Sequence, residues 1–139
     1  MIRFSKKIEY ALGALQYLGT HPNDSFSARE ISEQLDIPYE FLSKTMQQLA
    51  RFGLVNSNQG VKGGYRLTNP PENIKFTDIL KALDEDSGIV TCFGEDDEIC
   101  KRSSICLIKT PMSLIQSKID EIIASTTLAD IIYNASFND

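Results

Sequence analysis

Apolar residues recur at helical spacing from the start of the chain onwards. In residues 5–21 they form one stripe behind Ser5, whose residue type commonly caps helices: Ile8, Leu12, Leu15 and Leu18. Residues 27–35 repeat the pattern, and Ser27 followed by Glu30 has the spacing of a capping box. Both segments are predicted to be helices.

A third helix is predicted over residues 38–53. Pro38 suits the start of a helix, because its missing N–H would have no helical partner there, and Gly53 suits the end. The apolar residues expected to face the core are Phe41, Leu42, Met46 and Leu49.

The pattern then changes from helical spacing to alternation. Residues 54–57 and 65–68 alternate on either side of a segment that contains Gly60, Gly63 and Gly64, which predicts a β-hairpin. A hairpin that follows three helices is the order of a winged helix-turn-helix. The predicted fold class is therefore mainly α with a small β-hairpin wing.

The break at residues 69–73, which contains two prolines, separates two units. Residues 1–69 are interpreted as a winged helix-turn-helix DNA-binding region, and residues 70–139 as a region for a functional loop and dimerisation. A short helix is predicted over residues 76–85, with Thr77 as its cap.

Residues 84–106 show no periodicity and are predicted to form a loop. A longer helix over residues 110–125 and a short one over 126–134 follow. The longer helix is expected to serve both the core and a dimer seam through Met112, Ile115, Ile119, Ile122 and Ile123. No apolar run approaches the roughly 18 residues of a membrane span, so no membrane association is expected.

Charge is distributed unevenly along the chain. Residues 1–70 carry eight Lys and Arg against six Asp and Glu, and residues 71–139 carry six against thirteen, within a net charge of −5. A basic N-terminal half joined to an acidic C-terminal half indicates that the N-terminal half binds nucleic acid. The residues expected to contact DNA lie on the third helix and in the hairpin: Tyr39, Glu40, Ser43, Lys44, Gln47, Gln48, Arg51, Asn58, Gln59, Lys62 and Arg66.

These residue types suit a helix in the major groove of double-stranded DNA. Gln reads adenine with two hydrogen bonds, Lys reads guanine or contacts phosphate, and Tyr and Ser contact the backbone. A single winged helix makes few contacts, so a homodimer on a two-fold symmetric operator is expected. The alternative is a winged helix that binds protein through the same face.

All three cysteines, Cys92, Cys100 and Cys106, lie in the predicted loop. The first residues do not read as a signal peptide, so the chain is expected in the cytoplasm, where clustered thiols bind metal or sense redox state more often than they form disulfides. The C-x7-C-x5-C spacing is too open for a zinc ribbon. An iron–sulfur cluster, a thiol redox switch and three unrelated thiols all stay open on spacing alone.

Four segments carry a resemblance to a known family: SKKIEYAL, AREISEQLDIPYEFLSKTMQQLARFGLVNSNQGVKGGYRL, FTDILKALDE with three cysteines behind it, and STTLADII. They span most of residues 3–133, and they resemble the IscR/NsrR family of winged-helix transcription regulators. The resemblance implies a homodimer and an iron–sulfur cluster, either 4Fe–4S or 2Fe–2S, held in the loop by Cys92, Cys100 and Cys106. It also implies an affinity for DNA that depends on the cluster.

The chain departs from the family in its ligand set. Family members commonly space the thiols C-x5-C-x5-C, whereas the first gap here is two residues longer. The biogenesis regulators place a ligand His where this chain has Lys109, and a related redox sensor places one where it has Gly13. The nitric-oxide-sensing branch takes a carboxylate from the first helix of the partner subunit, and the matching residue here is Glu9.

The sequence therefore predicts a homodimeric transcription regulator, a repressor, whose operator affinity is controlled by an iron–sulfur cluster that senses nitric oxide, redox state or iron–sulfur status. The alternatives are a winged-helix regulator that uses its cysteines as thiol redox switches, and a protein-binding winged helix. An enzyme is not expected, because the chain has one His and no nucleophile–base pair or phosphate-binding loop.

Overall fold

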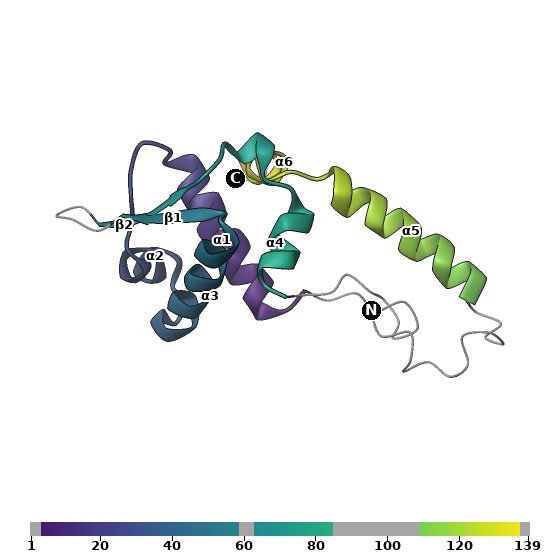
Figure 1. Ribbon diagram of the computed structural model, residues 1–139, viewed down its shortest axis with the longest axis horizontal. Coiled ribbons are helices and arrows are strands. Elements are labelled where there is room, and N and C mark those ends of the chain that lie inside the picture. The colour runs from purple at the N-terminus through teal and green to yellow at the C-terminus, as the bar shows by residue number, and fades with distance from the viewer. Residues whose placement is uncertain (1–3, 59–62, 85–108, 137–139) are drawn as a thin grey trace.

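The computed structural model describes residues 4–58, 63–84 and 109–136, and in these ranges it confirms a mainly helical chain with a two-stranded antiparallel hairpin (Figure 1). The first half contains three helices and the hairpin: α1 (Lys6–Thr20), α2 (Ala28–Leu35), α3 (Tyr39–Phe52), β1 (Val55–Asn58) and β2 (Gly64–Leu67). The described residues of the second half form a 3-10 helix and three α-helices: η1 (Pro71–Asn73), α4 (Phe76–Ala82), α5 (Lys109–Ser125) and α6 (Leu128–Ser136).

Local capping fixes the ends of the first three helices. Ser5 Oγ accepts a hydrogen bond from the Ile8 amide at 3.4 Å, and Ser27 Oγ accepts one from the Glu30 amide at 3.1 Å. Gly53 ends α3 with a φ of 93°, a conformation that strains any residue with a Cβ. The predicted caps at Ser5, Ser27 and Gly53 are confirmed.

The hairpin is joined to the α1–α2 loop by a backbone bridge. Within the hairpin the strands run antiparallel, with Val55 opposite Leu67. Phe26 in the loop pairs with Tyr65 of β2: the Phe26 amide donates to the Tyr65 carbonyl at 3.2 Å, and the Tyr65 amide donates to the Phe26 carbonyl at 2.6 Å. This pair of hydrogen bonds fixes the wing against the helices.

Gly64 lies so close to this bridge that a side chain would collide with it. A Cβ atom on Gly64 would lie 2.5 Å from the carbonyl carbon of Phe26. We expect Gly64→Ala to lower the free energy of unfolding by about 1–3 kcal/mol, because backbone atoms yield less easily than a flexible side chain. Urea unfolding followed by circular dichroism measures the change.

Gly13→Ala is the matched control for this prediction. Gly13 lies inside α1, and an added Cβ would meet Leu35 Cδ1 at 3.6 Å, an ordinary van der Waals distance. Because glycine weakens a helix interior, Gly13→Ala is expected to raise the free energy of unfolding by roughly 0.5–1 kcal/mol. A loss of stability at Gly13 as large as that at Gly64 would show that the bridge is not the cause.

The start of α4 differs from the prediction. Its N-cap is Lys75, whose amide donates to Asp78 Oδ2 at 3.2 Å, so Thr77 lies inside the helix. The prediction of Thr77 as the cap is wrong because the Asp78 carboxylate, at the third helical position, supplies a charged acceptor for the amide before the helix.

The joint between α5 and α6 is held by the segment that leads into α4. The Phe76 amide donates to the Thr126 carbonyl at 2.9 Å, and the Leu128 amide donates to the Ile74 carbonyl at 2.8 Å. Beyond the joint, α6 packs against α1 and η1, whereas α5 extends away from α1, α2 and α3 (Figure 1). These bonds anchor the C-terminal end of α5.

The buried side chains form a core that joins both halves of the chain. They include Leu15, Leu18, Ile31, Leu42, Met46, Leu49, Val55, Ile79, Leu83, Ile123 and Leu128. Residues from both sides of residue 69 contribute to this single core. The predicted division into residues 1–69 and 70–139 therefore concerns function, and it stays a prediction.

Phe41 does not belong to the core, so its predicted inward orientation is wrong. Its side chain is 41% exposed, and its ring packs edge-on against Tyr10 with 5.1 Å between the ring centroids. Thr45 takes the inner position instead. It is buried, and its hydroxyl donates to the Phe41 carbonyl at 3.0 Å, which satisfies the polar group.

Candidate nucleic-acid interface

The third helix, α3, has a buried face and an exposed face. The buried face packs into the core through Leu42, Met46 and Leu49. On the opposite side, exposed residues recur every three or four positions, which places them on a single stripe of the helix. We call this set the α3 stripe: Glu40, Lys44, Gln47 and Arg51.

The α2 side of the α3 stripe carries Tyr39 and Ser43, the first exposed and the second half-buried. The guanidinium of Arg29, on α2, lies over the Tyr39 ring at 4.4 Å from its centroid. This cation–π contact holds a positive charge beside the α3 stripe. Sequence reasoning missed Arg29, although an exposed basic residue in the first turn of α2 was an available signal.

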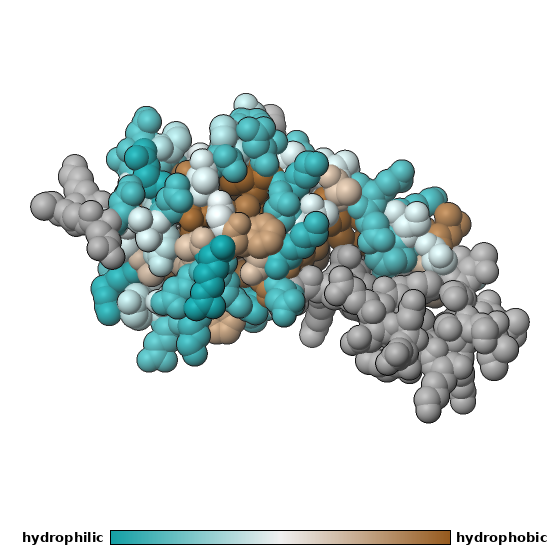
Figure 2. Space-filling model, in the orientation of Figure 1, coloured by the Kyte–Doolittle hydropathy of each residue, from teal (hydrophilic) through white to brown (hydrophobic). Residues whose placement is uncertain are grey.

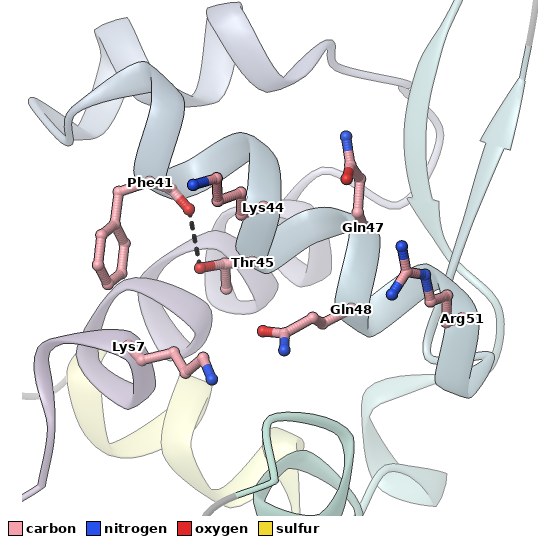
Figure 3. A pocket seen from close by; sticks show the side chains of 7 residues that line it. All are labelled: Lys7, Phe41, Lys44, Thr45, Gln47, Gln48 and Arg51. Atoms are coloured by element: carbon pink, nitrogen blue, oxygen red, sulfur yellow. Dashed lines mark hydrogen bonds between the residues drawn. The ribbon is translucent and has the colours of Figure 1, made fainter.

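The α1 side of the α3 stripe borders a cavity of about 350 Å³ between the two helices, which we call the α1–α3 cavity (Figure 3). Lys7 of α1 contributes to it, and its Nζ donates to the Leu83 carbonyl at 3.1 Å. Sequence reasoning did not include Lys7, because only the folded chain brings α1 beside α3. The lining residues are Lys7, Phe41, Lys44, Thr45, Gln47, Gln48 and Arg51.

The wing residues are only partly described. Asn58 is exposed at the end of β1, whereas Gln59 and Lys62 lie outside the described residues. Arg66 is exposed on β2, and its Nη2 donates to the Pro22 carbonyl at 3.2 Å. The structure thus brings the predicted residues of α3 together on one side of that helix, and it holds Arg66 against the α1–α2 loop.

A comparison with known families decides the class of protein. The model of the Rrf2 family, described as an iron-dependent transcriptional regulator, matches residues 4–134 of the chain. The chain belongs to the Rrf2 family. Its predicted resemblance to the IscR/NsrR regulators is confirmed by relatives and by solved structures.

Three comparisons describe how similar this Rrf2 chain is to known proteins. It is 27% identical to the transcriptional regulator NsrR of Halalkalibacterium halodurans over 127 residues, which cover 91% of this chain and 87% of that one. The structure of CymR, the global cysteine regulator of B. subtilis, matches with a TM-score of 0.76 and 27% identity over 96% of this chain and 98% of that one. The T. potens IscR structure matches with a TM-score of 0.74 and 26% identity, over 96% and 88%.

Membership of the Rrf2 family establishes a DNA-binding transcription regulator with a winged-helix fold, and it confirms that the protein is not an enzyme. The predicted winged helix is therefore confirmed. The contacts that individual residues of the α3 stripe and the hairpin make with DNA stay predictions.

The predicted carboxylate ligand of this Rrf2 chain, Glu9, lies on the exposed side of α1. Its carboxylate is 3.1 Å from Lys6 Nζ, with the two side chains 54% and 73% exposed. The Glu9 carboxylate raises the pKa of the Lys6 ammonium above its usual 10.5, first through this hydrogen bond and then through its charge. Exposed ion pairs of this kind are weak, so Lys6 is not a strong competitor for Glu9.

The predicted thiolate ligands, Cys92, Cys100 and Cys106, lie outside the described residues. Within residues 4–58, 63–84 and 109–136, no three His, Cys, Asp or Glu side chains gather into a group that could hold a metal ion. In the same part of the chain, no helix is long and apolar enough to cross a membrane.

Proposed function

We propose that this Rrf2 protein is a homodimeric repressor that binds double-stranded operator DNA through the α3 stripe and the hairpin. The observation that carries the proposal is the stripe itself, because the buried opposite face of α3 leaves Lys44, Gln47 and Arg51 exposed. Glutamine is the residue type that reads adenine in the major groove, and arginine or lysine reads guanine. The mostly hydrophilic surface over α2 and α3 supports the same role (Figure 2).

The exposed side of α5 supports the proposal that two copies associate. Leu114, Ile115 and Ile122 are 60%, 44% and 64% exposed, and hydrophobic surface shows toward the N-terminal end of α5 (Figure 2). A contiguous apolar side left in water marks an interaction surface, and a second copy would cover it in a two-fold symmetric dimer. We call this set the α5 seam: Leu114, Ile115, Ile119 and Ile122.

The effector site of the proposed repressor is an iron–sulfur cluster held by Cys92, Cys100 and Cys106. Clustered thiolates are the donors that such clusters take, and the description of the family as iron-dependent agrees with this donor set. We propose Glu9 of the partner subunit as the fourth ligand, which its exposure and its weak pairing with Lys6 support. The bound cluster supplies a centre that reacts with nitric oxide and oxidants.

Regulation requires the cluster to favour one arrangement of the two subunits over another, since a ligand shifts an equilibrium only by its differential affinity. A cluster held by the cysteines of one subunit and Glu9 of the other meets this requirement. Its loss is proposed to change the spacing of the two α3 helices and thereby the affinity for the operator.

The cluster is tested by anaerobic purification. The protein is expected to be coloured and to contain iron and sulfide in comparable amounts. Replacing any one of Cys92, Cys100 or Cys106 with Ser is expected to abolish the visible absorption, because too few thiolates remain. Glu9→Ala is expected to keep the colour and to speed its loss in air, because three thiolates stay in place. Optical spectra over time measure both effects.

Glu72→Ala, which removes an exposed carboxylate from η1, is the control for Glu9→Ala. A protein that stays colourless after anaerobic reconstitution would overturn the cluster. A Glu9→Ala protein that loses its colour at the wild-type rate would remove Glu9 from the ligand set and leave the cysteines in it.

The similarity to CymR, named as the global cysteine regulator of B. subtilis, favours a second candidate function. In this candidate, the same three cysteines act as thiol redox switches in a protein without a cluster. Mass spectrometry of iron-free protein, combined with operator binding before and after oxidation, discriminates between the two. A reversible thiol oxidation that changes operator affinity without iron would support the switch.

A further inference from the structure

The α1–α3 cavity gathers positive charge from two helices. Three cations line it together with the side-chain amides of Gln47 and Gln48, and no described carboxylate lines it (Figure 3). None of these cations forms an ion pair with another described residue. The three cations are Lys7, Lys44 and Arg51. Such a cavity is electrostatically suited to an anion.

Lys7 is held in the cavity by the end of α4. Its Nζ donates to the Leu83 carbonyl at 3.1 Å, and because an ammonium group has three N–H donors, two are left for a ligand. At about 350 Å³, the cavity is roughly ten times the volume that one water molecule occupies, which leaves room for a phosphate group.

In the proposed complex, the cavity would face a DNA backbone. The major groove is about 12 Å wide and a helix with its side chains is about 10–12 Å across, so a helix in the groove has a sugar–phosphate backbone close to each side. Side chains on the flanks of such a helix meet phosphates, whereas those at its centre meet bases. The α1–α3 cavity flanks the α3 stripe, because beyond the stripe residues it is lined on the α1 side by Phe41, Thr45 and Gln48.

We propose that the α1–α3 cavity receives a backbone phosphate of the operator and that Lys7 is the contact from α1. This inference rests on the proposed DNA-binding function, and it extends the interface to a helix outside the helix-turn-helix and the wing. A DNA phosphodiester and a free phosphate ion share the same chemistry. The position of the cavity beside the α3 stripe favours the phosphodiester.

The test is the salt dependence of operator binding by Lys7→Gln. This substitution removes the charge and keeps a side-chain N–H for the Leu83 carbonyl. The slope of the logarithm of the binding constant against the logarithm of the salt concentration is expected to become shallower by about 0.9 for each lost phosphate contact, or about 2 for a dimer. Fluorescence anisotropy with a labelled operator over a series of salt concentrations measures the slope.

Two further variants control this test. Lys7→Arg keeps the charge and is expected to keep the wild-type slope. Lys75→Ala removes an exposed lysine at the N-terminal end of α4, the end opposite Leu83, and is also expected to keep the slope. Melting temperatures of all the variants establish that each is folded before its binding is compared.

The outcomes separate this inference from the proposed function. A wild-type protein that binds no duplex in a selection from random sequences would overturn both. A wild-type protein that binds an operator, with the same slope in Lys7→Gln, would overturn the phosphate contact alone. Isothermal titration with inorganic phosphate separates the two sources of the anion. If phosphate binding depends on Lys7 while the operator slope does not, the cavity is a site for a free anion and the DNA contact is wrong.

Discussion

Replacing Ile122 with Asp is expected to dissociate the proposed dimer. Ile122 is 64% exposed and lies on the α5 seam, so its substitution does not disturb the core of the subunit. In a two-fold symmetric interface each substitution occurs twice. Loss of a buried isoleucine costs about 2 kcal/mol, and placing a carboxylate in the apolar seam adds about 1 kcal/mol or more. The total of about 6 kcal/mol corresponds to a roughly 10⁴-fold rise in the dimer dissociation constant.

Operator binding is expected to fall with the dimer. When the two winged helices of a dimer become independent monomers, the affinity for the operator drops by roughly 10²- to 10⁴-fold, because the second contact is no longer intramolecular. Analytical ultracentrifugation measures the association, and anisotropy with a labelled operator measures the binding.

Ser113→Asp is the matched control for the dimer experiment. Ser113 is also exposed on α5, but it lies about 180° around the helix from Ile122 and about 100° from Leu114, the nearest residue of the α5 seam. It is expected to leave both the dimer and operator binding unchanged. If the Ile122→Asp protein is still a dimer, the α5 seam is not the dimer interface.

The double substitution Lys44→Ala with Arg51→Ala is expected to have the second largest effect. Both residues are exposed on the α3 stripe and line the α1–α3 cavity. A lost contact to a base or a phosphate costs about 1–1.5 kcal/mol here, and the dimer loses four of them, so operator affinity is expected to fall by roughly 10³- to 10⁴-fold. The winged-helix fold is expected to stay intact, because the buried face of α3 is unchanged.

Gln47→Ala tests whether the α3 stripe reads bases as well as phosphates. Because glutamine carries no charge, its loss is expected to relax sequence preference at one position of each half-site and to leave the salt slope as in the wild type. Competition binding with operators that carry single base changes measures the preference. If the double substitution leaves DNA binding unchanged, the face is solvent-exposed or binds protein, which was the alternative prediction for a winged helix.

The local parts of the fold could be predicted from the sequence because they depend on neighbours along the chain. The caps at Ser5 and Ser27 and the stop at Gly53 each arise within one turn of helix. The two wrong predictions, for the buried face of α3 and for the start of α4, arose where two nearby residues could fill the same position. Thr45 lies on the inner side of α3 where the apolar Phe41 was expected, and the Asp78 carboxylate moves the start of α4 ahead of Thr77.

The α3 stripe could also be predicted, since helical periodicity alone separates Lys44, Gln47 and Arg51 from the buried face. Arg29 and Lys7 could not, because they reach the interface from α2 and α1 and only the packing of three helices brings them there. The assignment of Cys92, Cys100 and Cys106 to a cluster rests on donor chemistry and on the family, since spacing alone does not distinguish a cluster from a thiol switch.

The anchored joint between α5 and α6 gives the molecule a lever arm. With 17 residues, α5 is about 25 Å long, so a tilt of about 10° at the joint displaces its N-terminal end by about 4 Å. That displacement is close to the 3.4 Å step of one base pair. The backbone bonds from Ile74 and Phe76 that hold the joint lie at one end of α4, and Lys7 holds the other end. In a dimer joined through α5, small rotations of this seven-residue helix would change the distance between the two α3 helices. That distance determines whether both can enter the major groove at once.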